Sequence, residues 1–194
     1  MDTQPDQERT FIISVLTENK SGLLNAITII FTRRKINIES INVSMSEVSG
    51  VSRYTIVTVL TRERAEKLVK QIRKLIEVLG AFLYEEEDTH FQELALYKVP
   101  LEPFLNDSQN TIENLIRQNF ARIIVIEREY IIIEKTGRKH ETQKLFEELK
   151  AFGVSEFVRS ARISISKSKR RTERFLEELE ELSASTSKKM EYQD

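Results

Sequence analysis

The hydrophobic period of the chain changes repeatedly, and the same order of changes occurs twice. Alternation with a period of two is typical of strands, whereas apolar residues three or four apart indicate an amphipathic helix. Both halves therefore have the order βαββαβ. In the first half we expect strands at 11–16, 36–46, 51–60 and 81–84, with helices at 21–34 and 63–79. In the second half we expect strands at 94–99, 122–127, 130–135 and around Ile163 and Ile165, with helices at 108–119 and 139–152.

A βαββαβ unit most simply forms a four-stranded antiparallel sheet with both helices on one face. The sequence therefore predicts an α+β protein with two ferredoxin-like domains, at 10–86 and 91–166, and a charged, helical or disordered tail at 167–194. The five glycines are expected to lie between elements, because glycine inside an element is destabilising. Polar Ser40, Asn42 and Ser44 share one face of their strand, which suits packing against a second copy.

Composition excludes several classes of function. The chain has no cysteine, so a thiol nucleophile, a disulfide and a zinc thiolate site are excluded. Its net charge of −1 gives no general attraction to nucleic acid or to anionic membranes. There is no apolar run of about 20 residues, as a membrane span needs, and the polar residues 1–10 lack the core of a signal peptide. The cytoplasm is the expected location.

The strongest candidate site is the loop formed by Asn19, Lys20, Ser21 and Gly22, which leads from a strand into a helix at Leu23. Unpaired N–H groups at a helix start suit a carboxylate, and asparagine side chains both donate and accept hydrogen bonds. A second asparagine, Asn37, lies at the start of the next expected strand, followed by Ile38. We expect both segments to lie at one end of the sheet and to hold a free amino acid, with a pocket that straddles the interface of two copies.

Other interpretations remain open at this point. The loop is also compatible with a plain turn in which Ser21 caps the helix. His90 and His140 lack a second ligand at metal spacing, and the acidic run 85–87 is more typical of a solvated surface. RNA-binding domains share the same fold order, but they stack bases on strand aromatics, and here Tyr54 and Tyr130 are isolated. No set of residues for covalent catalysis is found.

Several segments resemble a known family: ISVLTENKSGLL at 13–24, RRKINIESINV at 33–43 and SRYTIVTV at 52–59, followed by ELALYKV at 93–99, YIIIEKTG at 130–137 and FGVSEFVRSARISIS at 152–166. Together they are similar to the small, regulatory subunits of acetolactate synthase (acetohydroxyacid synthase), which carry an N-terminal ACT domain. The resemblance covers about residues 11–166.

The resemblance implies a subunit without a catalytic site that forms a homodimer through its ACT domains. Such a subunit binds and activates a large catalytic subunit, and it confers feedback inhibition by valine bound between two ACT domains. Thiamine diphosphate, magnesium and FAD would belong to that partner, and this chain would carry no cofactor or metal. The second domain would contact the catalytic subunit, and neither nucleic acid nor membrane would be a partner. The valine-binding residues expected in this chain are Asn19, Lys20, Ser21, Gly22, Leu23, Asn37, Ile38 and Asn42.

Two positions depart from the family pattern. The turn at 46–50 reads SEVSG where a turn with proline and aspartate is common, and Asn42 stands where threonine is common. Asn42 is therefore expected to alter which branched-chain amino acid is preferred, or to weaken the response. The alternative interpretation is a free-standing sensor with two ACT domains that controls transcription or another enzyme.

Overall fold

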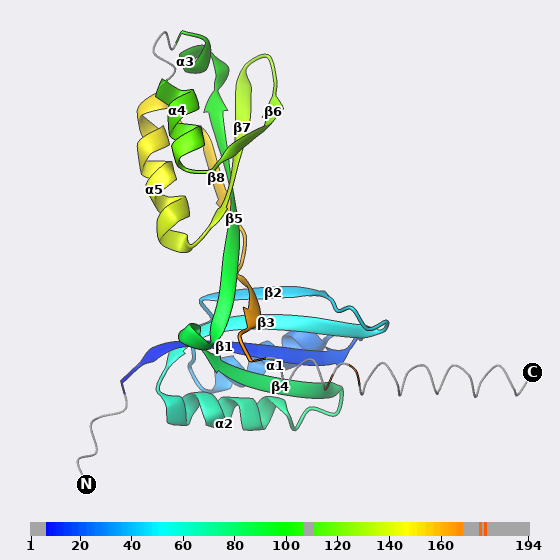
Figure 1. Cartoon of the computed structure of the whole chain (residues 1–194). Coiled ribbons are helices and arrows are strands. Elements are labelled where there is room, and N and C mark those ends of the chain that lie inside the picture. The colour runs from blue at the N-terminus through cyan, green and yellow to red at the C-terminus, as the bar shows by residue number, and fades with distance from the viewer. Residues whose placement is uncertain (1–6, 107–110, 169–174, 176, 178–194) are drawn as a thin grey trace, which may run out of the picture. The chain divides into compact units, whose positions relative to one another are not determined.

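The computed structural model describes residues 7–106, 111–168, 175 and 177, and these divide into two units (Figure 1). The first unit holds the described residues up to His90 together with those from Ser164 onward, and the second holds residues from Phe91 to Ile163. Each contains an antiparallel sheet with helices against one face. The expected fold of two ferredoxin-like domains is confirmed.

The first sheet has the strand order β2-β3-β1-β4. Its elements are β1 Arg9–Glu18, α1 Leu23–Arg33, β2 Ser40–Met45, β3 Val51–Leu60, α2 Arg62–Ile72, β4 Val78–Glu85 and the 3-10 turn η1 Glu86–Asp88. The inward side chains Ile13, Val15 and Ile56 pack with Phe31 of α1 and Leu68 of α2 in a buried core. Alternate residues point to opposite faces of a strand, so the residues between these core positions lie on the face that the helices leave open.

The second sheet has the order β6-β7-β5-β8, and β9 also pairs with β5. Its elements are β5 Thr89–Pro100, α3 Leu101–Leu105, α4 Thr111–Gln118, β6 Arg122–Ile126, β7 Tyr130–Gly137, α5 Lys139–Leu149, the 3-10 turn η2 Lys150–Phe152, β8 Glu156–Arg159 and β9 Ile163–Ser166. The core is formed by Tyr97 and Ile133 of the sheet with Ile112 of α4 and Leu145 of α5. This repeats the helix-on-sheet packing of the first unit.

The helix expected at 63–79 is shorter in the structure. It ends at Ile72, and Leu75 and Val78 then close tight turns through N–H bonds to residues three positions earlier. Ile76 keeps the apolar spacing of the helix but is 94% exposed. Gly80 consequently lies inside strand β4, not after a helix, so the expectation that no glycine falls within an element is wrong.

The end of the second sheet also differs from the expectation. The strand beside β5 is β8, in which Phe157 pairs with Tyr97, and the expected strand around Ile163 and Ile165 forms a further short pairing with β5 as β9. Strands β8 and β9 are separated by a break that begins at Ser160, whose N–H donates to the carbonyl of Leu94 at 2.8 Å. The short helix α3 was also not expected. Residues 108–110 of the expected third helix lie outside the described part of the chain.

Candidate ligand-binding site

Gly22 begins helix α1 with an open set of donors. It is the N-cap residue with φ 85° and ψ −11°, a left-handed conformation that glycine adopts without steric cost, and no side chain caps the helix. The first intrahelical bond runs from Ala26 N–H to Gly22 O at 3.0 Å. Among the described residues, the N–H groups of the first turn before Ala26 have no acceptor. The alternative in which Ser21 caps the helix is therefore wrong.

Asn19 is held on the neighbouring turn and keeps one polar group available. Its N–H donates to Gly50 O at 2.8 Å, and its side-chain Oδ1 accepts from Ser52 Oγ at 3.2 Å. No acceptor for its Nδ2 is found within the described residues, and the residue is exposed. Lys20 is ion-paired with Glu18, and the hydrogen bond from Lys20 to that carboxylate raises the pKa of Lys20. The loop therefore presents neutral donors, while its one cation is engaged locally.

Asn37 offers the opposite kind of group. Its side-chain Nδ2 donates to Glu39 Oε1 at 2.8 Å, and its backbone carbonyl accepts from Thr58 Oγ1 at 2.7 Å. Its Oδ1 is consequently an exposed acceptor without a donor in the described part of the chain. Ile38 beside it is half-buried and packs against the first core.

The two asparagines lie at opposite ends of the first sheet, which corrects the expectation that they share one end. Asn19 bonds to Gly50, next to Val51, whereas Asn37 bonds to Thr58, which is about 23 Å further along β3. The cause is the βαβ crossover, which makes β2 run parallel to β1. The start of β2 and the end of β1 therefore lie at different ends of the sheet. One chain cannot bring the two asparagines into one pocket.

Asn42 lies apart from both segments. It pairs with Thr55, which pairs in turn with Ser14, so all three belong to the open face of the first sheet. Asn42 is half-buried, whereas Asn19, Lys20, Ser21, Gly22 and Asn37 are exposed and Leu23 is 4% exposed. Because the side chain of Leu23 is buried, only its backbone N–H is available to a ligand.

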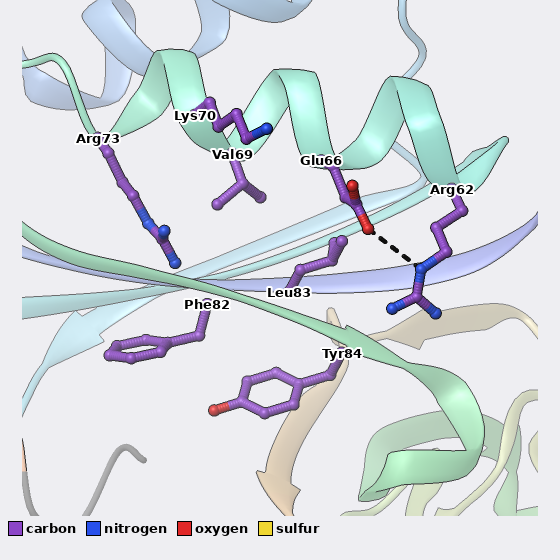
Figure 2. A pocket seen from close by; sticks show the side chains of 8 residues that line it. All are labelled: Arg62, Glu66, Val69, Lys70, Arg73, Phe82, Leu83 and Tyr84. Carbon is purple, nitrogen blue, oxygen red and sulfur yellow. Dashed lines mark hydrogen bonds and ion pairs between the residues drawn. The ribbon is translucent and has the colours of Figure 1, made fainter.

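A cavity that the sequence did not indicate lies between α2 and β4 and has a volume of about 230 Å³ (Figure 2). Its cations are largely engaged, because Arg62 contacts Glu66 and Glu85 at 3.1 and 2.6 Å and Arg73 donates to Ala81 O. Since β4 is an edge strand, Arg73 covers one of its outward carbonyls. The cavity contains none of the expected site residues, and its arrangement is explained by protection of the edge.

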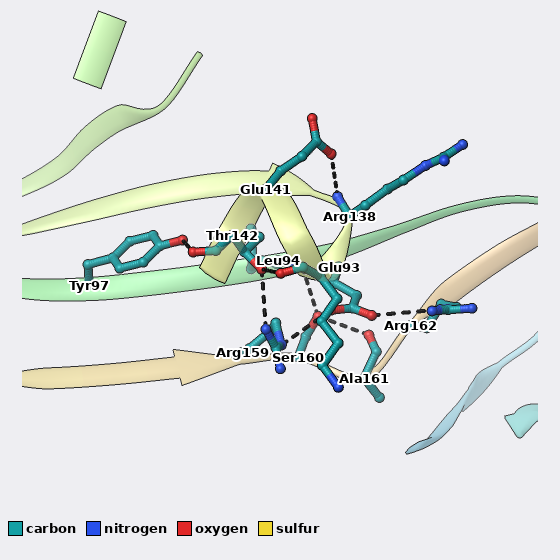
Figure 3. Close-up of polar contacts among 11 residues, drawn as sticks. Glu93, Leu94, Tyr97, Arg138, Glu141, Thr142, Arg159, Ser160, Ala161 and Arg162 are labelled. Atoms are coloured by element: carbon teal, nitrogen blue, oxygen red, sulfur yellow. Dashed lines mark hydrogen bonds and ion pairs between the residues drawn. The ribbon is translucent and has the colours of Figure 1, made fainter. Parts of the chain in front are cut away.

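A second polar cluster, in the second unit, joins β5 to α5 and β8 (Figure 3). Glu93, 7% exposed, contacts Arg159 at 3.2 Å and Arg162 at 3.7 Å. The fully buried Tyr97 donates from its hydroxyl to Thr142 O at 2.7 Å, and burial raises the pKa of Tyr97. These contacts all lie inside the second unit, although Glu93 Oε2 meets Arg159 as an ion pair without a hydrogen bond. The cluster ties β5 to α5 and β8, which gives it a structural role.

The described residues contain no group of three or more histidine, cysteine, aspartate and glutamate side chains placed to hold a metal ion. Within the same part of the chain, every helix is too short or too polar to cross a membrane.

The fold defines a protein with two ferredoxin-like domains. The family model of the AHAS small subunit-like ACT domain matches residues 13–80, and the model of the small subunit of acetolactate synthase matches residues 92–168. The chain therefore belongs to the family of acetolactate synthase small subunits, the regulatory subunits whose partner is a large catalytic subunit.

Individual relatives agree with this assignment. The acetolactate synthase small subunit of Bacillus subtilis is 37% identical over 150 residues, covering 77% of this chain and 86% of that protein. The corresponding protein of Mycolicibacterium smegmatis is 33% identical over 161 residues, covering 83% and 93%. The crystal structure of the small subunit from Thermotoga maritima superposes with a TM-score of 0.74 at 30% identity, covering 82% of this chain and 98% of that one.

Proposed function

We propose that this protein activates the large catalytic subunit of acetolactate synthase and makes it sensitive to feedback inhibition by valine. The observation that carries the proposal is the uncapped start of α1 at Gly22, in a chain of this family. Exposed N–H groups at a helix start attract a carboxylate, both as hydrogen-bond donors and through the helix dipole. Thiamine diphosphate, magnesium and FAD would be bound by the partner.

The polar groups of the two asparagines are complementary to a zwitterion. Asn19 Nδ2 and the first-turn N–H groups would donate to the carboxylate, and Asn37 Oδ1 would accept from the ammonium group. Ile38, half-buried beside Asn37, would supply apolar contact for a branched side chain. The arrangement favours an uncharged aliphatic amino acid, because Lys20 is occupied by Glu18.

Two copies would be needed to complete this site. Strand β2 is an edge of the first sheet, and its apolar Val43 and Met45 are 43% and 71% exposed. If two β2 edges paired antiparallel, Asn37 of one copy would come to the end of the sheet where Asn19 of the other copy lies. A homodimer through the ACT domains would therefore form two equivalent pockets at its interface.

Binding at such an interface would be transmitted to the enzyme by stabilising one dimer geometry. A ligand shifts an equilibrium only by its differential affinity for the two states, and typical coupling is about 1–3 kcal/mol. In this proposal residues 10–86 sense the amino acid, residues 91–166 contact the catalytic subunit, and the complex acts in the cytoplasm.

The test combines the purified full chain with the catalytic subunit from the same source. We expect turnover to rise on mixing and to fall again on addition of valine, and calorimetry should rank valine, leucine and isoleucine. Absence of stimulation would overturn the proposal. If the protein binds valine but leaves the catalytic subunit unaffected, the free-standing sensor is favoured, and a pull-down from native lysate should then recover a different partner.

A further inference from the structure

The face of the first sheet that the helices leave open carries an apolar cluster next to the candidate ligand loop. We name it the Gly80 notch, and it is lined by Leu16, Val48, Val51, Leu79, Gly80 and Phe82. Phe175, from the C-terminal segment, lies in this notch with its ring 5.6 Å from that of Phe82 at an interplanar angle of 71°. This edge-to-face geometry is the preferred arrangement of aromatic pairs.

The notch exists because residue 80 has no side chain. A Cβ atom at Gly80 would lie 2.9 Å from Cε1 of Phe175, closer than real Cβ contacts, and 3.1 Å from both Cζ of Phe175 and Cε2 of Phe82. Glycine weakens a strand interior, and it often marks the close approach of another group. The close approach of the Phe175 ring gives Gly80 a physical reason within β4.

Residues that line the Gly80 notch also contact the segment that carries Asn19. Val51 pairs with Glu18 at the end of β1, and Gly50 O accepts the N–H of Asn19 at 2.8 Å. The turn at 46–50 is closed by Ser46 N–H donating to Val51 O at 2.8 Å. This turn thus connects the ring of Phe175 to the backbone of Asn19.

We propose that Phe175 acts as a strap, a positioning residue whose ring holds the 46–50 turn and the Asn19 loop in place for the effector. When the ring leaves the notch, the buried side chains of Leu16, Val48 and Val51 lose an apolar neighbour and the turn loosens. A binding-competent loop that is populated for only a fraction of the time binds with an affinity reduced by that fraction.

Hydrogen exchange tests the strap without any ligand. Phe175→Ala removes the ring, and Gly80→Ala forces the ring to move, because the added Cβ would lie 2.9 Å from its Cε1, while leaving the tail sequence intact. Phe120→Ala is the matched control, because Phe120 is 93% exposed in the second unit. We expect the amides of Asn19 and Ser46 to exchange about five-fold faster or more in the first two variants and unchanged in the control. Equal protection in all four proteins, with β7 as the reference for a folded chain, would overturn the proposal.

Fluorescence gives a second reading that does not depend on exchange. The chain has no tryptophan, so Phe175→Trp introduces a single reporter. Its emission should be blue-shifted relative to the same variant carrying Gly80→Ala. Identical emission from the two proteins would mean that the ring does not occupy the notch.

The effect on the effector rests on the proposed function, and its failure can be told apart. If the wild type binds valine, Phe175→Ala should bind it about five-fold more weakly or worse, and valine should in turn shift the emission of the Phe175→Trp variant, because coupling is reciprocal. Equal affinity of wild type and Phe175→Ala would overturn the strap alone. If no branched-chain amino acid binds the wild type, the proposed function fails, and the exchange and fluorescence results still decide whether the strap exists.

Discussion

Replacement of Gly22 by aspartate or by asparagine separates charge from shape at the start of α1. A Cβ at this position meets nothing within 4 Å, so neither side chain is excluded by contacts. The φ of 85° imposes a backbone cost of about 1 kcal/mol or less on both, since asparagine and aspartate tolerate the left-handed region best after glycine. Both are also equally good N-cap residues. The two variants therefore differ mainly by one negative charge.

The charge sets the expected loss of affinity. Two like charges about 4 Å apart repel by about 1 kcal/mol in water and by about 4 kcal/mol at the effective dielectric of a protein surface. Competition for the first-turn N–H groups is common to both side chains and therefore cancels in the comparison. We expect Gly22→Asp to bind valine at least about five-fold more weakly than Gly22→Asn.

Isothermal titration of both variants with valine measures this difference, and thermal unfolding checks that they are equally folded. Equal affinity for valine in the two variants would refute the placement of the carboxylate at Gly22. This holds also when both variants bind valine equally more weakly than the wild type, because the loss would then come from the backbone and not from the charge.

Three further predictions concern other parts of the chain. Tyr97→Phe should lower the free energy of unfolding by about 0.5–1.5 kcal/mol, because the hydrogen bond from the buried hydroxyl to Thr142 O is lost, as denaturant titration would measure. Burial raises the pKa of Tyr97, so the contribution of its hydroxyl to the free energy of unfolding is complete below about pH 10 and falls as the pH rises further. The Phe variant should lack that fall, which unfolding titrations at about pH 9 to 11 would detect. Glu93→Ala should cost about 3–5 kcal/mol in urea unfolding, because two partly buried arginines lose their counter-charge, and a cost below about 1 kcal/mol would contradict this. Asn42→Thr should change the ratio of valine to leucine affinity in calorimetry while leaving the melting temperature nearly unchanged, since Asn42 is half-buried on the open face.

The fold class could be predicted from sequence because the hydrophobic period indicates which face of each element is buried. The prediction was wrong where this period does not distinguish a helix from a turn or is too short to show a strand. Ile76 continues the helical spacing beyond Ile72 although the chain has already turned, and its side chain is 94% exposed. Strand β8 has only four residues, with Glu156 and Arg159 at its ends, so no apolar alternation marked it.

The candidate site could be predicted only in its local parts. The glycine at a strand-to-helix turn identified the start of α1, because a left-handed N-cap favours a residue without a Cβ. The separation of Asn19 from Asn37 was within reach of sequence reasoning, since a βαβ crossover fixes the parallel direction of the second strand. The Gly80 notch was not, because the ring that fills it comes from Phe175, far along the chain.

The position of Asn37 has a thermodynamic consequence for regulation. If a pocket needs Asn19 of one copy and Asn37 of another, a single chain offers only half of the contacts, so the ligand binds the dimer better than the separated chains. Ligand that binds one state preferentially stabilises that state by mass action. Valine would then stabilise the β2 interface, because it binds the dimer more tightly than the separated chains. For the same reason, the measured affinity for valine would fall as the protein is diluted below its dimer dissociation constant.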